Sequence, residues 1–255
     1  MSDKEPAKKT KKKSAAKKSK KTDTVEEKSV IYIDYTAMTK EDSTVFDTTQ
    51  EEVAKEHGIY KEKERYQPML VALGWNWLLE ALEEEIVGMK LGEEKKVEIP
   101  PEKGAGFPDP KKIKTISKTK LAKHGDRPIK GESITFGRER GVITAVMGRT
   151  VRVDFNSPLA GKTLIFNVEV KEIIVDPLER LQAVVKRRIP VLEDGRVNVT
   201  IDGEVINIEL PKETRYIENI AFGEVGIASD ALKMYEEAKK VKICTVFDRP
   251  EENQT

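Results

Sequence analysis

The stretch from Asp154 to Val170, DFNSPLAGKTLIFNVEV, decides how the rest of the chain is interpreted. Its first half is rich in turn-forming residues, and Gly161 frees the backbone. Its second half has the two-residue period of a strand, with Leu164, Phe166 and Val168 directed to one side. The stretch therefore predicts a chain that leaves one structural unit and enters the core of another. An ordinary turn followed by a core strand is the simpler alternative.

The composition describes a charged chain long enough for two or three modest domains. Charged residues make up 36% of its 255 residues, and mean hydropathy is -0.54. No apolar run reaches the length of a membrane span, and lysines rather than an apolar segment follow the N-terminus, so we expect neither a membrane span nor a signal peptide. The single Cys244 excludes an internal disulfide and fits a reducing compartment, which predicts the cytoplasm.

The N-terminal segment differs sharply from the rest of the chain. Residues 1–22 hold ten lysines and two acidic residues, a net charge of +8, while the whole chain carries +1. The remainder is therefore acidic, at -7. Low-complexity Lys, Ser, Ala and Thr bury little apolar surface, so residues 1–27 are predicted to be a disordered tail.

The first part of the body reads as alternating strands and helices. Strands are predicted from Val30 to Met38, from Val45 and from Met69 to Leu73. Between the last two we expect a short helix that ends before Gly58 and is capped by Thr48 or Thr49.

A central helix is predicted to open at Gly74 and to end at Gly88. Its buried side repeats at helical spacing, and comprises Leu78, Leu79, Leu82, Ile86 and Met89. Its glutamates are expected to face water, namely Glu80, Glu83, Glu84 and Glu85. A strand from Lys95 to Ile99 and a Pro/Gly-rich loop, PPEKGAGFPDP, follow.

The remaining segments predict two further units. Residues 111–157 contain short β-like apolar runs punctuated by glycines, which indicates a small β-barrel-like module with a thin core. After Asp176-Pro177 we expect an amphipathic helix, then a hairpin around Asp202-Gly203, a helix capped by Ser229, and a last strand in which Cys244 is buried.

Five segments in order carry a family resemblance: DYTAM, VFDTT, LGWNWLLEALEEEIVGMKLGE, VEIPPEKGAG and LAGKTLIFNVEV. Over roughly residues 30–104 and 158–174 the chain resembles FKBP-type peptidyl-prolyl cis-trans isomerases (rotamases), in particular a SlyD-like long archaeal type with an insert in the flap and a C-terminal domain. The resemblance implies an α+β fold, with an antiparallel sheet wrapped around one helix, a small inserted β domain and a separate α/β C-terminal domain. The implied division is a discontinuous isomerase domain, 28–110 and 158–175, an inserted chaperone domain, 111–157, and a C-terminal domain, 176–255.

The resemblance also implies which residues form the site. The catalytic pocket would comprise Tyr35, Phe46, Asp47, Leu78, Leu79, Leu82 and Phe166, with the Leu79 N–H bonding a substrate carbonyl. Substrate contacts would come from Trp75 and Ala105, and from the insert's Ile134, Phe136, Val142, Ile143, Val146 and Met147. The alternative is that the pocket residues are plain core.

One departure from the family pattern concerns the loop residue Ala105. The family's usual tyrosine, which bonds a substrate carbonyl, is replaced here in Gly104-Ala105-Gly106. Such a bond contributes roughly 0.5–1.5 kcal/mol net, so activity is expected to be weakened rather than lost. The two functional hypotheses are a prolyl isomerase with chaperone activity that accelerates proline-limited folding, and a holdase or adaptor with a weakened isomerase site.

The expected partners are unfolded or nascent polypeptides with X-Pro bonds. We expect the protein to be a monomer that does not bind a membrane. Prolyl isomerisation needs no cofactor, and His57 and His124 lack companion ligands, so neither a cofactor nor a metal is predicted. The tail has two interpretations, nonspecific contact with RNA or ribosomes, or a solvated extension, because lysines without aromatic residues bind phosphates but do not read sequence.

Overall fold

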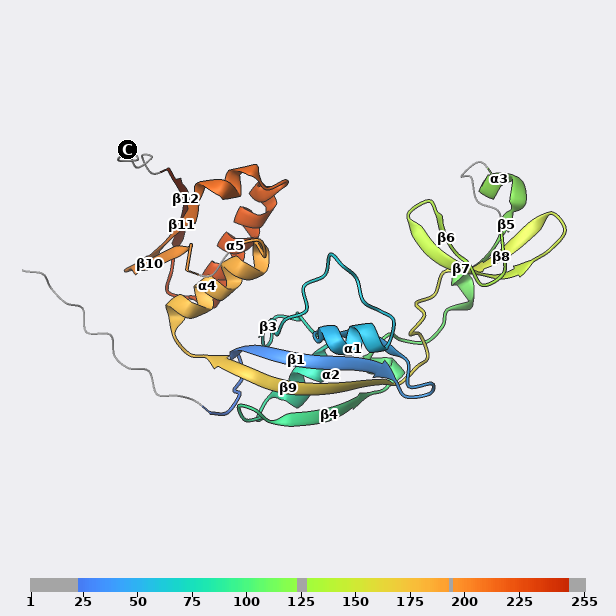
Figure 1. Ribbon diagram of the computed structural model, residues 1–255, viewed down its shortest axis with the longest axis horizontal. Coiled ribbons are helices and arrows are strands. Elements are labelled where there is room, and N and C mark those ends of the chain that lie inside the picture. The colour runs from blue at the N-terminus through green and yellow to red at the C-terminus, as the bar shows by residue number, and fades with distance from the viewer. Residues whose placement is uncertain (1–22, 123–127, 193–194, 248–255) are drawn as a thin grey trace, which may run out of the picture.

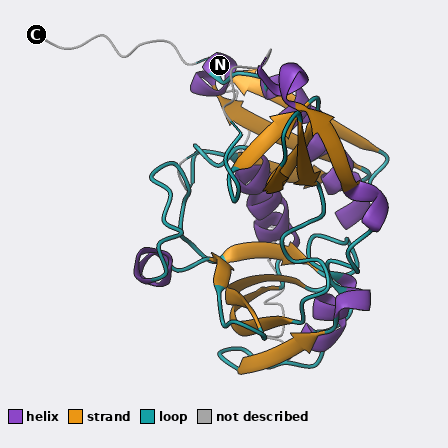
Figure 2. Cartoon of the chain, turned by 90° about the vertical axis from the view of Figure 1, so that its right-hand side faces the viewer, coloured by secondary structure: helices purple, strands orange, loops and turns teal. Residues whose placement is uncertain are grey.

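The computed structural model describes residues 23–122, 128–192 and 195–247, and three β-sheets organise them (Figure 1). Residues 1–22 of the predicted tail lie outside the described residues, as does His124. For residues 23–27 the prediction of disorder is wrong, because Val25 is 1% exposed in the core and its N–H donates to the Met89 carbonyl (2.8 Å). Strands and helices both contribute to the fold (Figure 2), which confirms the α+β class. Among the described helices, none is long and apolar enough to cross a membrane.

The central sheet has five strands, all paired antiparallel. They are β1 (Val30–Thr39), β2 (Val45–Thr48), β3 (Met69–Ala72), β4 (Glu94–Ile99) and β9 (Leu164–Ile174). The order is β2-β1-β9-β4. Strand β3 lies on the same edge of β1 as β2, where β2 pairs with the second half of β1 and β3 with the first. The strand predicted from the opening stretch is therefore β9, at the centre of the sheet.

One helix fills the main face of this sheet. Helix α2 (Glu80–Ile86) packs Leu82 and Ile86, both at most 1% exposed, against inward residues of the sheet such as Ile33 and Val168. Burying such side chains contributes about 1.5–3 kcal/mol each. Helix α1 (Glu51–Glu56) and the single turns η1 (Pro101–Lys103) and η2 (Pro110–Lys112) lie in the connections.

The predicted start of the central helix is wrong. The helix begins at Glu80 rather than at Gly74, and Gly74–Leu79 is a loop with left-handed backbone at Gly74 (φ +79°) and Asn76 (φ +55°). Glu83 is also not directed to water, since it is only 6% exposed. Its carboxylate turns back to the loop and accepts backbone hydrogen bonds there. The predicted end is confirmed, because Gly88 follows the helix with φ +90°.

The predicted cap of α1 is wrong as well. Its N-cap is Gln50, which makes no side-chain capping bond. The two threonine hydroxyls are used across the sheet instead, because Thr48 donates to the Tyr35 carbonyl (3.0 Å) and Thr49 donates to the Asp34 carboxylate (2.8 Å).

The insert, residues 111–157, folds around a separate four-stranded sheet. Its elements are β5 (Ile113–Ser117), α3 (Lys118–Ala122), β6 (Ser133–Phe136), β7 (Glu139–Val146) and β8 (Thr150–Asp154). The order β5-β8-β7-β6 leaves β5 and β6 as edges among the described residues, so the sheet does not close into the expected barrel. A Cβ at Gly141 would stand 2.7 Å from the Asp154 carbonyl oxygen, so only glycine fits where β7 crosses β8.

The C-terminal unit, residues 176–247 as described, has a mixed three-stranded sheet and two helices. Its elements are α4 (Pro177–Arg188), β10 (Asn198–Asp202), β11 (Val205–Pro211), η3 (Lys212–Tyr216), α5 (Ile220–Met234) and β12 (Lys240–Val246). The predicted hairpin is the antiparallel pair β10–β11, and β12 adds parallel to β11. Asp176 caps α4 by accepting from the Leu178 and Glu179 N–H groups.

Two predictions for this unit are wrong. Ser229 lies inside α5, which begins nine residues earlier at Ile220; Gly223 and Gly226 weaken the helical pattern there. Cys244 is exposed, not buried, because alternation along β12 directs Val241 and Ile243 to the core and Cys244 outward.

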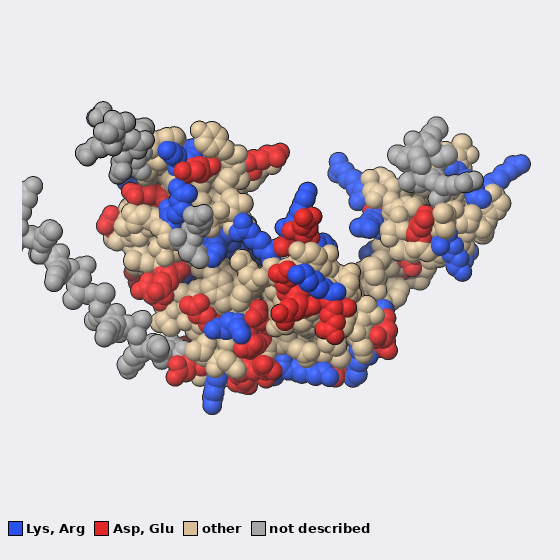
Figure 3. Space-filling model, in the orientation of Figure 1, with Lys and Arg blue, Asp and Glu red and all other residues tan. Residues whose placement is uncertain are grey.

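The C-terminal unit packs on the central sheet, on the face opposite α2. Ala183 and Val184 of α4 share a buried cluster with Val30, Leu70 and Ala72, whose neighbours along β1 and β3 point to α2. The insert stands away from this body on the other side (Figure 1). On the face that Figure 3 shows, Lys and Arg side chains surround the insert, whereas Asp and Glu gather on the central part.

Candidate active site

Three aromatic side chains come together on the face of the central sheet that packs on α2. Tyr35 lies on β1, Phe46 on β2 and Phe166 on β9. The ring centroids of Tyr35 and Phe166 are 6.3 Å apart, as are those of Phe46 and Phe166, whose planes meet at 87°. Edge-to-face pairs at this distance are favourable, because the positive rim of one ring meets the negative face of another. The three rings form one continuous apolar wall.

Aliphatic side chains close the same cluster from the helix side. Leu82 is 1% exposed and belongs to the core beneath the rings, whereas Leu78 and Leu79 are half-buried at its edge. Sequence reasoning misses four further half-buried residues packed against this core, Met69, Ala81, Leu159 and Ile173. The position of Met69 directly after Pro68, at the start of β3, is the one local signal for it.

A hydrogen bond ties the Tyr35 hydroxyl to the exposed Asp47 carboxylate. The hydroxyl donates to Asp47 Oδ2 over 2.7 Å. Burial of the ring, followed by this hydrogen bond, raises the pKa of Tyr35 well above its ordinary value of 10. The phenol therefore keeps its proton at neutral pH and holds the carboxylate beside the aromatic wall.

The loop Gly74–Leu79 is fixed from below by Glu83. Glu83 Oε2 accepts from the Gly74 N–H (2.7 Å), and Oε1 accepts from the N–H groups of Trp77 (3.0 Å) and Leu78 (3.2 Å). The next N–H along the chain, that of Leu79, finds no acceptor among the described residues. A half-buried N–H without a partner is available to a ligand carbonyl. The structure thus leaves the Leu79 N–H open at the edge of the apolar cluster, and the first N–H groups of α2, those of Glu80 and Ala81, follow it without an acceptor among the described residues.

Backbone hydrogen bonds hold the loop next to Ala105. The Gly106 N–H donates to the Pro101 carbonyl (2.8 Å), and the Gly161 N–H donates to the Gly106 carbonyl (2.7 Å). Ala105 is half-buried and its methyl group offers no hydrogen bond. This loop is therefore joined to the return segment from the insert but adds no polar side chain at this position.

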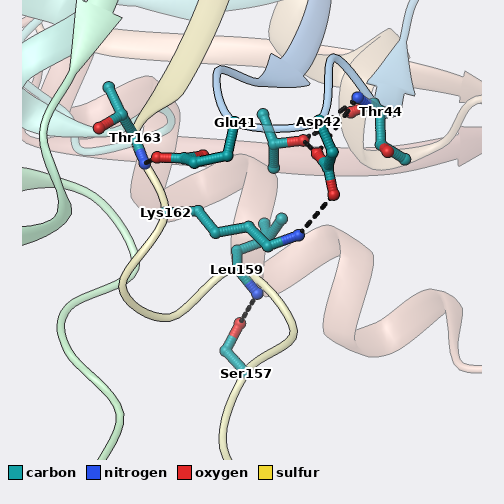
Figure 4. A network of polar contacts seen from close by, with 8 residues as sticks. Glu41, Asp42, Thr44, Ser157, Leu159, Lys162 and Thr163 are labelled. Atoms are coloured by element: carbon teal, nitrogen blue, oxygen red, sulfur yellow. Dashed lines mark hydrogen bonds and ion pairs between the residues drawn. The ribbon is translucent and has the colours of Figure 1, made fainter.

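A polar network fixes the return segment to the β1–β2 turn (Figure 4). Lys162 Nζ donates to Asp42 Oδ2 (3.0 Å), and the Thr163 N–H donates to Glu41 Oε1 (2.9 Å). The hydrogen bond from Thr39, followed by that from Lys162, holds the pKa of Asp42 well below its usual range. The contacts bring the start of β9, which carries Phe166, against the hairpin that carries Phe46.

The predicted substrate-binding residues of the insert divide by exposure. Ile134 and Ile143 are 6% and 1% exposed and form the insert's core, with Phe136 half-buried beside them. The exposed members are Val142, Val146 and Met147, at 36–40% exposure. These three of the six side chains are therefore the exposed ones.

Trp75 is not brought to the pocket. It is half-buried in a different cluster, together with Trp77 and Met234 of the C-terminal unit. A cleft of about 680 Å³ extends from the pocket to the C-terminal unit. It is lined by Tyr35, Asp47 and Met69 and by Ala183 and Arg187 of α4. Among the described residues, no group of three or more His, Cys, Asp or Glu side chains is arranged to hold a metal ion.

Comparison with known proteins assigns these features to a family. The model of the FKBP-type peptidyl-prolyl cis-trans isomerases matches residues 21–171, and the model described as FKBP26_C-terminal matches residues 177–248. The chain is 42% identical over 132 residues to the short-type peptidyl-prolyl cis-trans isomerase of Methanocaldococcus jannaschii. The aligned region covers 52% of this chain and 84% of that protein.

Bacterial relatives agree with this assignment. The FKBP-type 16 kDa peptidyl-prolyl cis-trans isomerase of Escherichia coli is 37% identical over 112 residues, 42% of this chain and 74% of the relative. The FKBP-type isomerase SlyD of Aeromonas hydrophila is 31% identical over 157 residues, 60% of this chain and 66% of the relative. The fold, the order of the motifs and these matches together show that the chain belongs to the FKBP-type peptidyl-prolyl cis-trans isomerase family.

Proposed function

We propose that the chain accelerates cis-trans isomerisation of X-Pro bonds at the pocket walled by Tyr35, Phe46 and Phe166 and floored by Leu82. The barrier to rotation, roughly 18–20 kcal/mol, arises because twisting the amide breaks its resonance. An apolar wall removes water from the amide and so disfavours its dipolar planar form relative to the twisted one. No nucleophile, metal or cofactor is required by this chemistry.

The open Leu79 N–H beside this wall is the observation that carries the proposal. A substrate carbonyl that accepts this hydrogen bond would be held with its proline ring against the aromatic side chains. The Asp47 carboxylate, positioned by the Tyr35 hydroxyl, would polarise the same space. Because the proposed pocket residues all belong to this chain, we propose that it acts as a monomer.

Replacing Asp47 tests the assignment of the pocket. Asp47→Ala is expected to lower kcat/KM for a proline tetrapeptide about tenfold, or about 1.4 kcal/mol of transition-state stabilisation. The melting temperature should change little, because Asp47 is exposed. Glu52→Ala on α1 removes an equally exposed carboxylate outside the pocket and is the matched control. Equal kcat/KM for the two variants would contradict the assignment of Asp47 to the catalytic pocket.

The insert, which we propose as an inserted chaperone domain, would collect unfolded segments on its exposed apolar surface. Val142, Val146 and Met147 supply this surface. Val146→Ser with Met147→Ser should therefore lower catalysis of proline-limited protein refolding while leaving tetrapeptide turnover unchanged. Arg149→Ser, at an exposed position in the same β7–β8 turn, is the control, and an equal effect of both changes on refolding would refute the role of this surface.

A second function rests on Ala105. Without the usual tyrosine, the pocket holds its substrate with one hydrogen bond fewer, and a holdase or adaptor with a weakened isomerase site becomes the alternative. In that case peptide binding by the insert would persist when tetrapeptide turnover is absent.

We also propose that the Lys-rich tail contacts RNA or ribosomes in the cytoplasm and places the protein near nascent chains. The tail's charge of +8 against -7 for the rest of the chain supports an electrostatic attachment without sequence preference. The competing attachment point is the basic stretch 111–130 of the insert, which holds seven lysines and one arginine against a single aspartate.

A further inference from the structure

The chain's two tryptophans lie in the loop that leads to the proposed substrate donor. Trp75 and Trp77 are both half-buried, with ring centroids 5.3 Å apart and planes at 86°. They precede Leu79, whose N–H is an open donor, by four and two residues. Their cluster includes Ala183 and Met234, so the C-terminal unit covers them.

Each tryptophan ring has a cation from the C-terminal unit above it. The Arg187 guanidinium, on α4, is 3.7 Å from the Trp77 ring centroid. The Lys233 ammonium, on α5, is 4.3 Å from the Trp75 ring centroid. Attraction between a cation and the negative face of an indole is stronger when both are shielded from water. Arg187 meets this condition, because it is half-buried.

The loop has little backbone support of its own. Gly74 and Asn76 both adopt left-handed backbone, which L-residues rarely adopt. At its two ends the Trp75 N–H donates to the Ala72 carbonyl (3.2 Å), and the Leu79 carbonyl accepts from the N–H groups of Leu82 (2.8 Å) and Glu83 (3.0 Å). Between these ends the loop's backbone is held through the Glu83 carboxylate. The loop is therefore fixed from inside by Glu83 and from outside by the two cations.

We propose that the C-terminal unit positions the isomerase site, with Arg187 and Lys233 as the positioning residues. By holding the tryptophan pair, they fix the direction of the Leu79 N–H at the pocket edge. Neither residue touches the substrate in this account, and the role rests on the proposed function of Leu79. Catalysis then depends on a part of the chain more than 100 residues distant from the loop in sequence.

The experiment combines activity with two measurements of the loop itself. Arg187→Ala, Lys233→Ala and the double variant are compared by tetrapeptide kcat and KM, by amide hydrogen exchange at Trp77–Leu79, and by tryptophan fluorescence, which reports this loop because the chain has no other tryptophan. Lys28→Ala is the matched control. It removes the exposed ion pair with Glu236, which also joins the two units, and leaves both cations above the tryptophans in place.

Each single variant is expected to lower kcat/KM about two- to fivefold, as the size of a cation–π contact implies, with the double variant lower still. Exchange of the Leu79 amide should rise, the tryptophan emission should shift, and Arg187→Lys should recover part of the activity. Lys28→Ala should change none of these. If the wild-type chain has no isomerase activity, the fluorescence and exchange changes still test whether Arg187 and Lys233 hold the loop. Unchanged Leu79 exchange in a folded double variant, or an equal effect of Lys28→Ala, would overturn the proposal.

Discussion

Replacing Glu83 by glutamine changes one oxygen of the buried carboxylate to an amide that cannot accept a hydrogen bond. At least one of three backbone donors then loses its acceptor, the Gly74 N–H if the amide replaces Oε2. An unsatisfied donor costs roughly 1–3 kcal/mol, and the remaining bonds weaken because their acceptor is no longer a carboxylate. We therefore expect Glu83→Gln to lower the free energy of unfolding by about 2–4 kcal/mol.

The assay is urea unfolding of Glu83→Gln beside Glu84→Gln. Glu84 is the next residue of the same helix, but its side chain is 63% exposed and its nearest cation, Lys103, is 3.7 Å away. Its replacement should cost less than about 0.5 kcal/mol. Tetrapeptide kcat/KM should fall for Glu83→Gln alone, because the loop that carries Leu79 loses its support. Equal stabilities for the two variants would refute the account of the loop.

Three further predictions concern the pocket and the tail. Ala105→Tyr should raise tetrapeptide kcat/KM several fold, about the 0.5–1.5 kcal/mol of one added hydrogen bond; no activity before or after the change would favour the holdase. Because the folded-state pKa of Tyr35 is raised above 10, the contribution of Tyr35 to stability is complete below pH 10 and declines above it. Tyr35→Phe should therefore flatten the fall of the unfolding free energy above pH 10, and an unchanged slope would contradict this. Full-length protein should bind RNA at low salt and lose about 10³–10⁵ in affinity between 50 and 200 mM salt if the tail engages six to ten phosphates, whereas a chain starting at Asp23 should not bind; equal binding by both would point to the insert.

Local patterns were sufficient for the strands, whereas the grouping of the pocket residues came from the family resemblance. The alternation of Leu164, Phe166 and Val168 predicts the inward face of β9, because side-chain direction in a strand depends only on its period of two. The ordered motifs place Tyr35 and Phe46 beside Phe166, and the structure brings these three rings together. Their roles in catalysis remain predictions.

Features that depend on how one segment folds onto another were not predictable from local patterns. Glu83 belongs to a run of glutamates of the kind that faces solvent on a helix. Only the loop folded above it explains its burial. The same holds for Trp75, whose partner Lys233 comes from another unit. Cys244 was assigned to a core because its neighbours are apolar, yet alternation along β12 directs Val241 and Ile243 to the core and Cys244 outward.

The most direct test of the central claim is an NMR titration of the chain with a proline tetrapeptide. Exchange between the peptide's cis and trans forms and the amide shift of Leu79 are followed in the same samples. The account predicts faster cis-trans exchange together with a saturable downfield shift of the Leu79 amide proton, because that N–H gains an acceptor. Accelerated exchange without any change at Leu79, or a shift at Leu79 without acceleration, would contradict the account.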